Sequence, residues 1–143
     1  MAKSTSVFLE NLECWQQAKK LAVEMYQIST NGNLNQDCSL RDQLRKSAIA
    51  IASQIANGRE RRDSSEFIQF LRAAKASAAE LRTQLIISRE IGYLSEGDYL
   101  DLEDNINRIT AMIGGLIRAI RRRSENRPEG QRENGQDIPL SIK

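Results

Sequence analysis

The sequence predicts an all-α protein, an up-down-up-down antiparallel four-helix bundle, and two observations support this fold class. Apolar side chains recur at alternating steps of three and four residues through four successive segments, which places one buried stripe on each helix. Short links rich in Gly, Asn, Ser or charged residues separate the segments, and such links join antiparallel neighbours. At 143 residues the chain is long enough for one domain with its own core.

The composition divides the chain into three parts. We expect a flexible arm over residues 1–10, the bundle over residues 11–123, and a disordered tail over residues 124–143, where Asn, Gln, Glu, Arg, Gly and Pro dominate. The tail ends in Asp-Ile-Pro-Leu-Ser-Ile-Lys, which has three aliphatic residues in a polar stretch. A random tail is the simpler expectation for it, and docking on a partner is the alternative.

The first two helices are expected over residues 11–29 and 39–57, with a loop between them. Asn11 is the candidate N-cap of the first helix, and Trp15, the only tryptophan, is its candidate core anchor. Gly58 suits the position just beyond the second helix, where a left-handed conformation often ends a helix.

The third and fourth helices carry the clearest buried stripes. The third helix is expected from Ser64 to Gly92, whose freedom at positive φ would end it, and the fourth runs from a cap at Ser95 to residue 123. The third stripe consists of Phe67, Leu71, Ala74, Ala78, Leu81, Leu85 and Ser88. The fourth stripe consists of Tyr99, Leu102, Ile106, Ile109, Ile113, Leu116 and Ile120.

Charge is unevenly distributed although the net charge is only +2. Basic residues dominate residues 41–89 and 105–123, whereas acidic residues gather over residues 96–104, so we expect a basic region and a separate acidic one. The candidate nucleic-acid-binding residues lie in the link before the third helix, on a stripe of that helix, and on the outer face of the fourth. They are Arg59, Arg61, Arg62, Arg72, Lys75, Arg82, Arg89, Arg108, Arg118, Arg121, Arg122 and Arg123. Solvated charged faces are the alternative interpretation.

Apolar residues and glycines that lie off the buried stripes predict contact between copies of the chain. A monomer would expose much of this surface, and the paired glycines in mid-helix favour a close neighbour. The residues are Ile49, Ile68, Ile86, Gly114, Gly115 and Ile117. We therefore expect a homo-oligomer.

Several classes of function are disfavoured by composition. The absence of histidine removes the commonest general base and metal ligand, and we expect no catalytic, cofactor or metal site. Cys14 and Cys38 are too far apart in sequence to indicate a chelating pair, and reduced thiols are expected. No stretch approaches the roughly 20 apolar residues of a membrane span. We expect a cytoplasmic protein without a membrane partner.

Four stretches resemble a known bacterial family. They are residues 12–18, Leu-Glu-Cys-Trp-Gln-Gln-Ala; residues 51–58, Ile-Ala-Ser-Gln-Ile-Ala-Asn-Gly; the long segment 67–85; and residues 91–94, Ile-Gly-Tyr-Leu. The chain resembles the four-helix-bundle family of the ribosomal RNA intervening-sequence protein. The resemblance implies a homopentamer without enzymatic activity. Gln54 and Asn57 depart from the Asn and Glu usual in that family's second-helix motif.

Two hypotheses for function follow. The first is a non-catalytic homo-oligomer that binds nucleic acid, RNA above all, through its basic outer surface. The second comes from the resemblance alone, because some relatives are accessory proteins of reverse transcriptases in diversity-generating retroelements. In that case the chain would be a scaffold that binds a reverse transcriptase with its RNA and cDNA.

Overall fold

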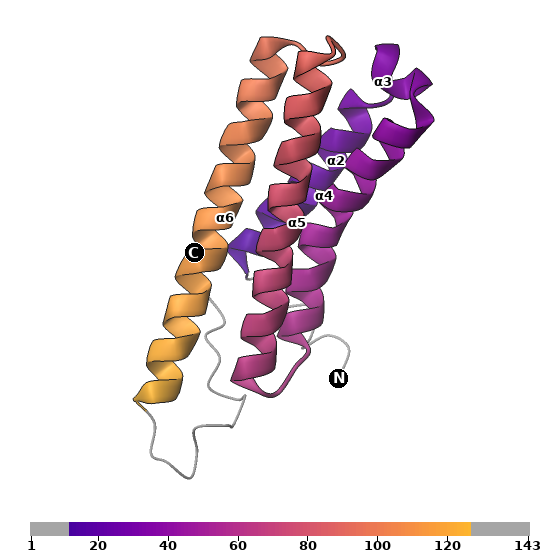
Figure 1. Ribbon diagram of the computed structural model, residues 1–143. Coiled ribbons are helices and arrows are strands. Elements are labelled where there is room, and N and C mark those ends of the chain that lie inside the picture. Colours follow the sequence, from indigo (N-terminus) through magenta and orange to yellow (C-terminus); the bar gives the residue numbers. More distant parts are fainter. Residues whose placement is uncertain (1–11, 127–143) are drawn as a thin grey trace.

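The computed structural model describes residues 12–126, and every element in that range is a helix. Figure 1 shows four longer helices lying side by side, with the short α3 at one end. The elements are α2 (Glu13–Ile28), α3 (Gly32–Gln36), α4 (Cys38–Arg59), α5 (Ser64–Glu90) and α6 (Glu96–Glu125). The prediction of an all-α protein is confirmed, whereas the predicted loop before α4 contains the extra helix α3, anchored by buried Leu34.

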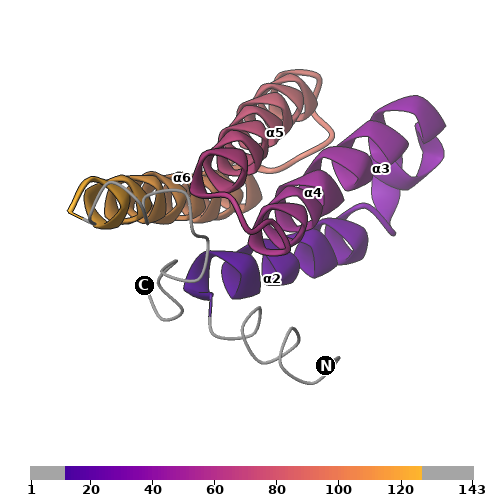
Figure 2. The ribbon, with the colours of Figure 1, turned by 90° about the horizontal axis from the view of Figure 1, so that it is seen from below.

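The four longer helices enclose one hydrophobic core. α4 packs against α2 and α5, and α6 closes the ring because it contacts both α5 and α2. Figure 2 shows this arrangement end-on. The largest fully buried side chains come from all four helices and include Leu21, Leu44, Ile51, Leu71, Leu81 and Leu102. Burying each such aliphatic side chain contributes about 1.5–3 kcal/mol, which makes the shared core the main source of stability.

The buried stripes of α5 and α6 match the prediction, whereas Trp15, the predicted core anchor of α2, lies only partly buried at the edge of the core. All the predicted stripe residues of α5 and α6 are buried. On α2, Cys14 and Leu21 are buried, whereas Trp15 and Ala22 pack at the edge of the core. Both faces of α2 carry apolar residues, so periodicity alone does not choose between them. The bulky indole stays at the edge, with the Lys19 ammonium 5.1 Å from its centre.

Side-chain caps fix the starts of three helices. The carboxylate of Asp37 accepts a hydrogen bond from the Leu40 N–H, and that of Asp63 accepts one from the Ser65 N–H. The Ser95 hydroxyl accepts from the Asp98 N–H, as the sequence predicts. α2 differs, because Leu12 occupies its N-cap position without a side-chain bond. The predicted cap Asn11 lies outside the described residues.

Of the two glycines predicted to end helices, Gly92 does so and Gly58 does not. Gly92 adopts φ +85° directly after α5, as expected for the residue that ends this helix. Gly58 does not end α4, which continues through Arg59. A Cβ at Gly58 would lie 2.8 Å from Cδ1 of Phe67 and 2.9 Å from Cβ of Phe70. Glycine is therefore required there for close packing of α4 on α5.

The residues predicted to join copies of the chain differ in exposure. Ile68 and Ile117 are buried within the single chain, at 9% and 7% exposure, so the expectation that a monomer exposes them is wrong. They widen the buried faces of α5 and α6. Ile86 is half-buried against the core, whereas Ile49 is 40% exposed. Gly114 and Gly115 are half-buried, and a Cβ at either position would lie within 4 Å of the Arg118 guanidinium.

The predicted boundaries of the bundle can be compared with the structure at the end of α6 only. α6 continues to Glu125, two residues beyond the predicted end of the bundle. The predicted arm, and the tail from residue 127 on, lie outside the described residues. Within residues 12–126, no helix is long and apolar enough to cross a membrane.

Candidate nucleic-acid interface

Two arginine-rich segments lie at the same end of the bundle. Arg82 of α5 contacts Asn107 of α6, and Arg89 stacks on Tyr99, so residue numbers fall along α6 as they rise along α5. The last turns of α6 therefore lie at the end where α5 begins. Figure 1 shows this end at the bottom, together with the link between α4 and α5. Antiparallel packing of α5 and α6 thus places at one end of the bundle two basic segments that are far apart in sequence.

We call this region the basic end and define it by its arginines, which come from the α4–α5 link and the last turns of α6. They are Arg59, Arg61, Arg62, Arg118, Arg121, Arg122 and Arg123. All except Arg59 are exposed. Arg122 and Arg123 lie in the last turn of α6, where cations also complement the negative end of the helix dipole.

The link arginines are held in different ways. The Arg61 guanidinium lies 4.7 Å from the centre of the Phe70 ring, a cation–π contact that orients it while leaving the residue exposed. Arg59 is half-buried at the end of α4, and burial lowers the pKa of its guanidinium. Arg62 is exposed on the link. Arg61 and Arg62 therefore remain accessible to an anionic ligand.

The predicted stripe on α5 divides into two halves. Arg72 and Lys75, in the half nearer the basic end, are exposed. Arg82 donates a hydrogen bond to the Asn107 side chain of α6. Arg89 lies 4.0 Å from the centre of the Tyr99 ring and 3.7 Å from a Glu96 carboxylate oxygen. The second half of the stripe thus serves the contact between α5 and α6.

Arg108 also has a partner within the chain. Its guanidinium donates to the Asp104 carboxylate at 2.8 Å, one turn earlier on α6. Both side chains are exposed, so this ion pair stabilises the fold only weakly. The nearby carboxylate does, however, weaken the attraction of Arg108 for an anionic ligand.

The opposite end of the bundle is acidic. The end of α5 and the first turns of α6 carry exposed carboxylates, and Figure 1 shows these segments at the top. The residues are Glu90, Glu96, Asp98, Asp101 and Asp104. The bundle is therefore electrically polar along its axis, which the net charge of +2 conceals.

Metal binding and thiol chemistry find little support among the described residues. No three His, Cys, Asp or Glu residues between Leu12 and Asn126 are grouped so that they could hold a metal ion. Cys14 is buried, and burial raises the pKa of its thiol to about 12, whereas Cys38 is exposed. A thiol with so high a pKa is a poor nucleophile near neutral pH.

Sequence comparison identifies the family. A model of the 23S rRNA-intervening sequence protein family matches residues 10–115. The chain belongs to this family. No curated protein matches the chain.

A solved structure supports the fold of this family member. It is a crystal structure of a protein of unknown function from the S23 ribosomal protein family of Bacteroides thetaiotaomicron. The two chains are 18% identical and superpose with a TM-score of 0.67, over 73% of this chain and 97% of the other. At this identity the likeness concerns the fold alone.

Proposed function

We propose that this protein is a non-catalytic RNA-binding protein that holds RNA phosphates at the basic end. The observation that carries the proposal is that Arg61 and Arg62 lie at the same end of the bundle as the exposed arginines of the last turns of α6, while exposed acids occupy the opposite end. Guanidinium groups bind phosphate oxygens with paired donors, and such contacts dominate affinity for nucleic acid.

RNA is the ligand that the family description favours over DNA, since the family is named for an intervening sequence of 23S rRNA. Few aromatic side chains are exposed, and Phe70 is already occupied by Arg61. Base stacking therefore contributes little in this proposal, and binding is expected to be salt-sensitive and weakly sequence-specific. Arg72 and Lys75 extend the proposed surface along α5.

The proposal includes a homo-oligomer, specifically a homopentamer of up-down-up-down antiparallel bundles in the cytoplasm. Support for self-association comes from exposed Ile49, with half-buried Ile86, Gly114 and Gly115 as further contact positions. A ring would repeat the basic end once per subunit, so each field would add to the next. Support for the alternating topology comes from the short links between successive long helices.

An accessory scaffold for a reverse transcriptase is the alternative carried over from the family resemblance. Both functions would use the basic end for RNA, but the scaffold also requires a protein partner. Co-purification of a reverse transcriptase with the tagged protein from its native cell, persisting after ribonuclease treatment, would favour the scaffold.

The test is RNA binding by a variant with Arg121→Ser, Arg122→Ser and Arg123→Ser. Affinity for a labelled single-stranded RNA is measured by fluorescence anisotropy over a series of salt concentrations. We expect affinity at low salt to fall by at least about tenfold, and the slope of log K against log salt to decrease by about 2, because roughly 0.7 counterions are released per phosphate contact.

A charge-matched control keeps the change in net charge constant. Lys19, Lys20 and Lys46 are exposed on α2 and α4, away from the basic end, and are replaced together by serine. This control should bind RNA nearly as the parent does. Equal losses in both variants would reject the basic end as the site, and a parent that binds no RNA at low salt would reject the function.

Self-association has its own test. Light scattering at micromolar concentration should give a mass several times the 16.2 kDa of one chain. Ile49→Asp should lower that mass while leaving the helical circular dichroism spectrum unchanged, because Ile49 is exposed within the chain. A parent that scatters as a single chain would contradict this part of the proposal.

A further inference from the structure

An apolar groove runs between α2 and α4, away from the basic end. Val23, Tyr26 and Ile49 are 53%, 44% and 40% exposed there, which is unusual for three large apolar side chains that lie together. Two hollows of about 430 and 460 Å³ meet at Tyr26 and Ile49 and form one continuous depression. Ala22 and Ala52 line one of these hollows and make it shallow and smooth.

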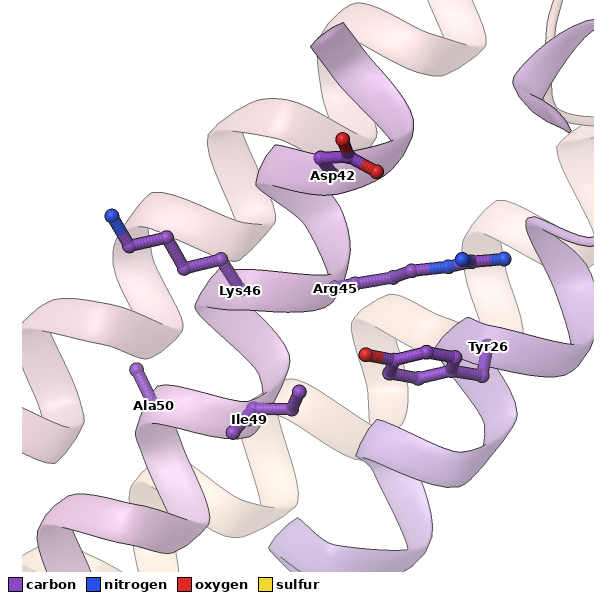
Figure 3. Close-up of a pocket in the computed structure, with 6 residues that line it drawn as sticks. All are labelled: Tyr26, Asp42, Arg45, Lys46, Ile49 and Ala50. Carbon is purple, nitrogen blue, oxygen red and sulfur yellow. The ribbon is translucent and has the colours of Figure 1, made fainter. Parts of the chain in front are cut away.

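Charged side chains mark the two ends of this groove. Figure 3 shows Tyr26 reaching from α2 toward α4, beneath the guanidinium of Arg45 and beside Ile49. That guanidinium lies 4.5 Å from the ring centre and donates to the Ser29 hydroxyl at 2.8 Å, so the ring is held in place. Asp42, near the start of α4, lines one end of the groove. Lys19 of α2 lines the other end.

We infer that residues 137–143 of the same chain dock in this groove. They read Asp-Ile-Pro-Leu-Ser-Ile-Lys and lie outside the described residues. Their aliphatic members Ile138, Leu140 and Ile142 alternate with other residues, so in an extended conformation all three face the same side. Pro139 disfavours a helix and biases the preceding residue toward extended backbone.

The length of this segment matches the groove, and its first residue, Asp137, has a charge opposite to that of Lys19 at one end. Lys19 precedes Tyr26 by seven residues and Asp42 precedes Ile49 by seven, which gives a groove of about 20 Å at 1.5 Å per residue. Seven extended residues span about the same length. Asp137 then faces Lys19 while Lys143 faces Asp42, and the aliphatic side chains cover Val23, Tyr26 and Ile49. The reverse orientation would place Lys143 beside Lys19. The other end of the groove does not decide the orientation by charge, because Asp42 is paired with Arg41 at 3.0 Å and Arg45 and Lys46 line the same hollow.

The segment can reach the groove within its own chain. Asn105 of α6 donates a hydrogen bond to Glu24 of α2 at 3.2 Å, and Glu125 follows Asn105 by 20 residues, or about 30 Å of helix. The lateral path around α2 adds about one helix diameter, roughly 10 Å. From Asn126 to Asp137 the chain spans up to about 36–40 Å when extended, which covers this distance.

This docking does not depend on RNA binding, but it is coupled to self-association. Ile49 belongs both to the groove and to the surface proposed for contact between copies. The docked segment and a second copy of the chain therefore compete for the same apolar surface.

The experiment is disulfide trapping in the full chain with the exposed thiol removed by Cys38→Ser. Buried Cys14 does not interfere, because its thiol is inaccessible. One cysteine replaces Ile138 and the other replaces Val23 in the groove. Disulfide formation in a glutathione buffer is followed by non-reducing electrophoresis and mass spectrometry. We expect an intrachain disulfide, since docking brings the two Cα atoms within bonding range.

The matched control pairs Ile138→Cys with Leu100→Cys. Leu100 is about as exposed as Val23, at 51% against 53%. It lies on α6, and its distance from the end of that helix is comparable with the distance from the same end to Val23. The groove pair should form its intrachain disulfide at least about tenfold faster than this control, because docking raises the effective concentration. Leu140→Ser with Ile142→Ser, added to the groove pair, should reduce its rate to that of the control.

Three results would overturn the inference. They are equal rates for the groove pair and the Leu100 pair, an unchanged rate after Leu140→Ser with Ile142→Ser, and disulfides formed mainly between chains. The last is detected by mixing ¹⁵N-labelled and unlabelled protein and weighing the cross-linked product. None of these readouts involves RNA, so failure here is distinguishable from failure of the proposed function.

Discussion

Arginines at the two ends of this bundle have different surroundings. Toward the acidic end, Arg82 and Arg89 of α5 reach across to α6, where they contact Asn107, Tyr99 and Glu96. At the basic end, Arg121 and Arg122 lie in the last turns of α6 and are exposed. The residue type is the same, but one pair joins two helices and the other faces solvent.

A basic residue therefore indicates a ligand-binding site only after its partners within the chain are known. An arginine that stacks on tyrosine and pairs with glutamate must break those contacts before it can bind phosphate. An exposed arginine loses only side-chain freedom. The proposed RNA surface therefore concentrates at the basic end, and the predictions below test whether the two ends differ as described.

The largest effect on stability is expected at the junction that shapes the basic end. Gly58→Ala places a Cβ 2.8 Å from Cδ1 of Phe67 and 2.9 Å from Cβ of Phe70, which lie at the start of α5. We expect the free energy of unfolding to fall by about 1–3 kcal/mol, because helix packing must open to admit the methyl group. Urea denaturation followed by circular dichroism measures the change.

Gly97, in the first turn of α6 at the acidic end, provides the control. Among residues 12–126, a Cβ there would meet no neighbouring side chain or packed backbone within 4 Å. Gly97→Ala should therefore leave stability unchanged or raise it by up to about 1 kcal/mol, since alanine loses less backbone entropy on folding. A loss at Gly97 equal to that at Gly58 would show that close packing is not the reason for glycine at position 58.

A smaller effect is expected from the arginine that stacks at the acidic end. Arg89→Ala removes the cation–π contact with Tyr99 and the ion pair with Glu96, which together stabilise the fold by about 1 kcal/mol. Arg121→Ala, at an exposed site, should change the free energy of unfolding by less than about 0.5 kcal/mol. Equal losses in the free energy of unfolding for both variants would show that arginines at the two ends do not differ in their contribution to stability.

A pH-dependent effect of similar or smaller size is expected from Tyr99. Its hydroxyl donates to the Glu103 carboxylate at 2.6 Å, and this bond raises the pKa of Tyr99 above its usual value near 10. A raised pKa in the folded state means that the contribution is fully present below about pH 10 and is lost as pH rises further. Tyr99→Phe should therefore cost about 0.5–1.5 kcal/mol at pH 7.

The deficit of the Tyr99→Phe variant should shrink as pH rises above about 10, because the parent then loses the same hydrogen bond. Urea denaturation of both proteins at a series of pH values measures this difference. A deficit that stays constant through the alkaline range would contradict the role given to this bond.

Much of the fold could be predicted because its signals are local. The unbroken stripes of α5 and α6 and the cap at Ser95 depend only on residues a few positions apart. The face of α2 could not be chosen in the same way, because apolar residues lie on two of its sides. The need for glycine at position 58 depends on Phe67 and Phe70, which only helix packing brings near.

The candidate site could be predicted only in part for the same reason. The arginine-rich segments are visible in the sequence, but whether each arginine has a partner depends on contacts between helices. Arg82 and Asn107 are 25 residues apart in the chain, and no local pattern indicates that they meet. Likewise, Ile68 and Ile117 lie off the predicted stripes, yet packing buries both of them.

The most direct test measures two quantities on two double variants. Arg82→Ala with Arg89→Ala changes the acidic-end pair, and Arg118→Ala with Arg121→Ala changes the basic-end pair. The free energy of unfolding and the affinity for a single-stranded RNA at low salt are measured for both. We expect the first variant to lose stability but retain RNA affinity, and the second to lose RNA affinity but retain stability. Loss of RNA affinity in the first variant with none in the second would contradict this expectation.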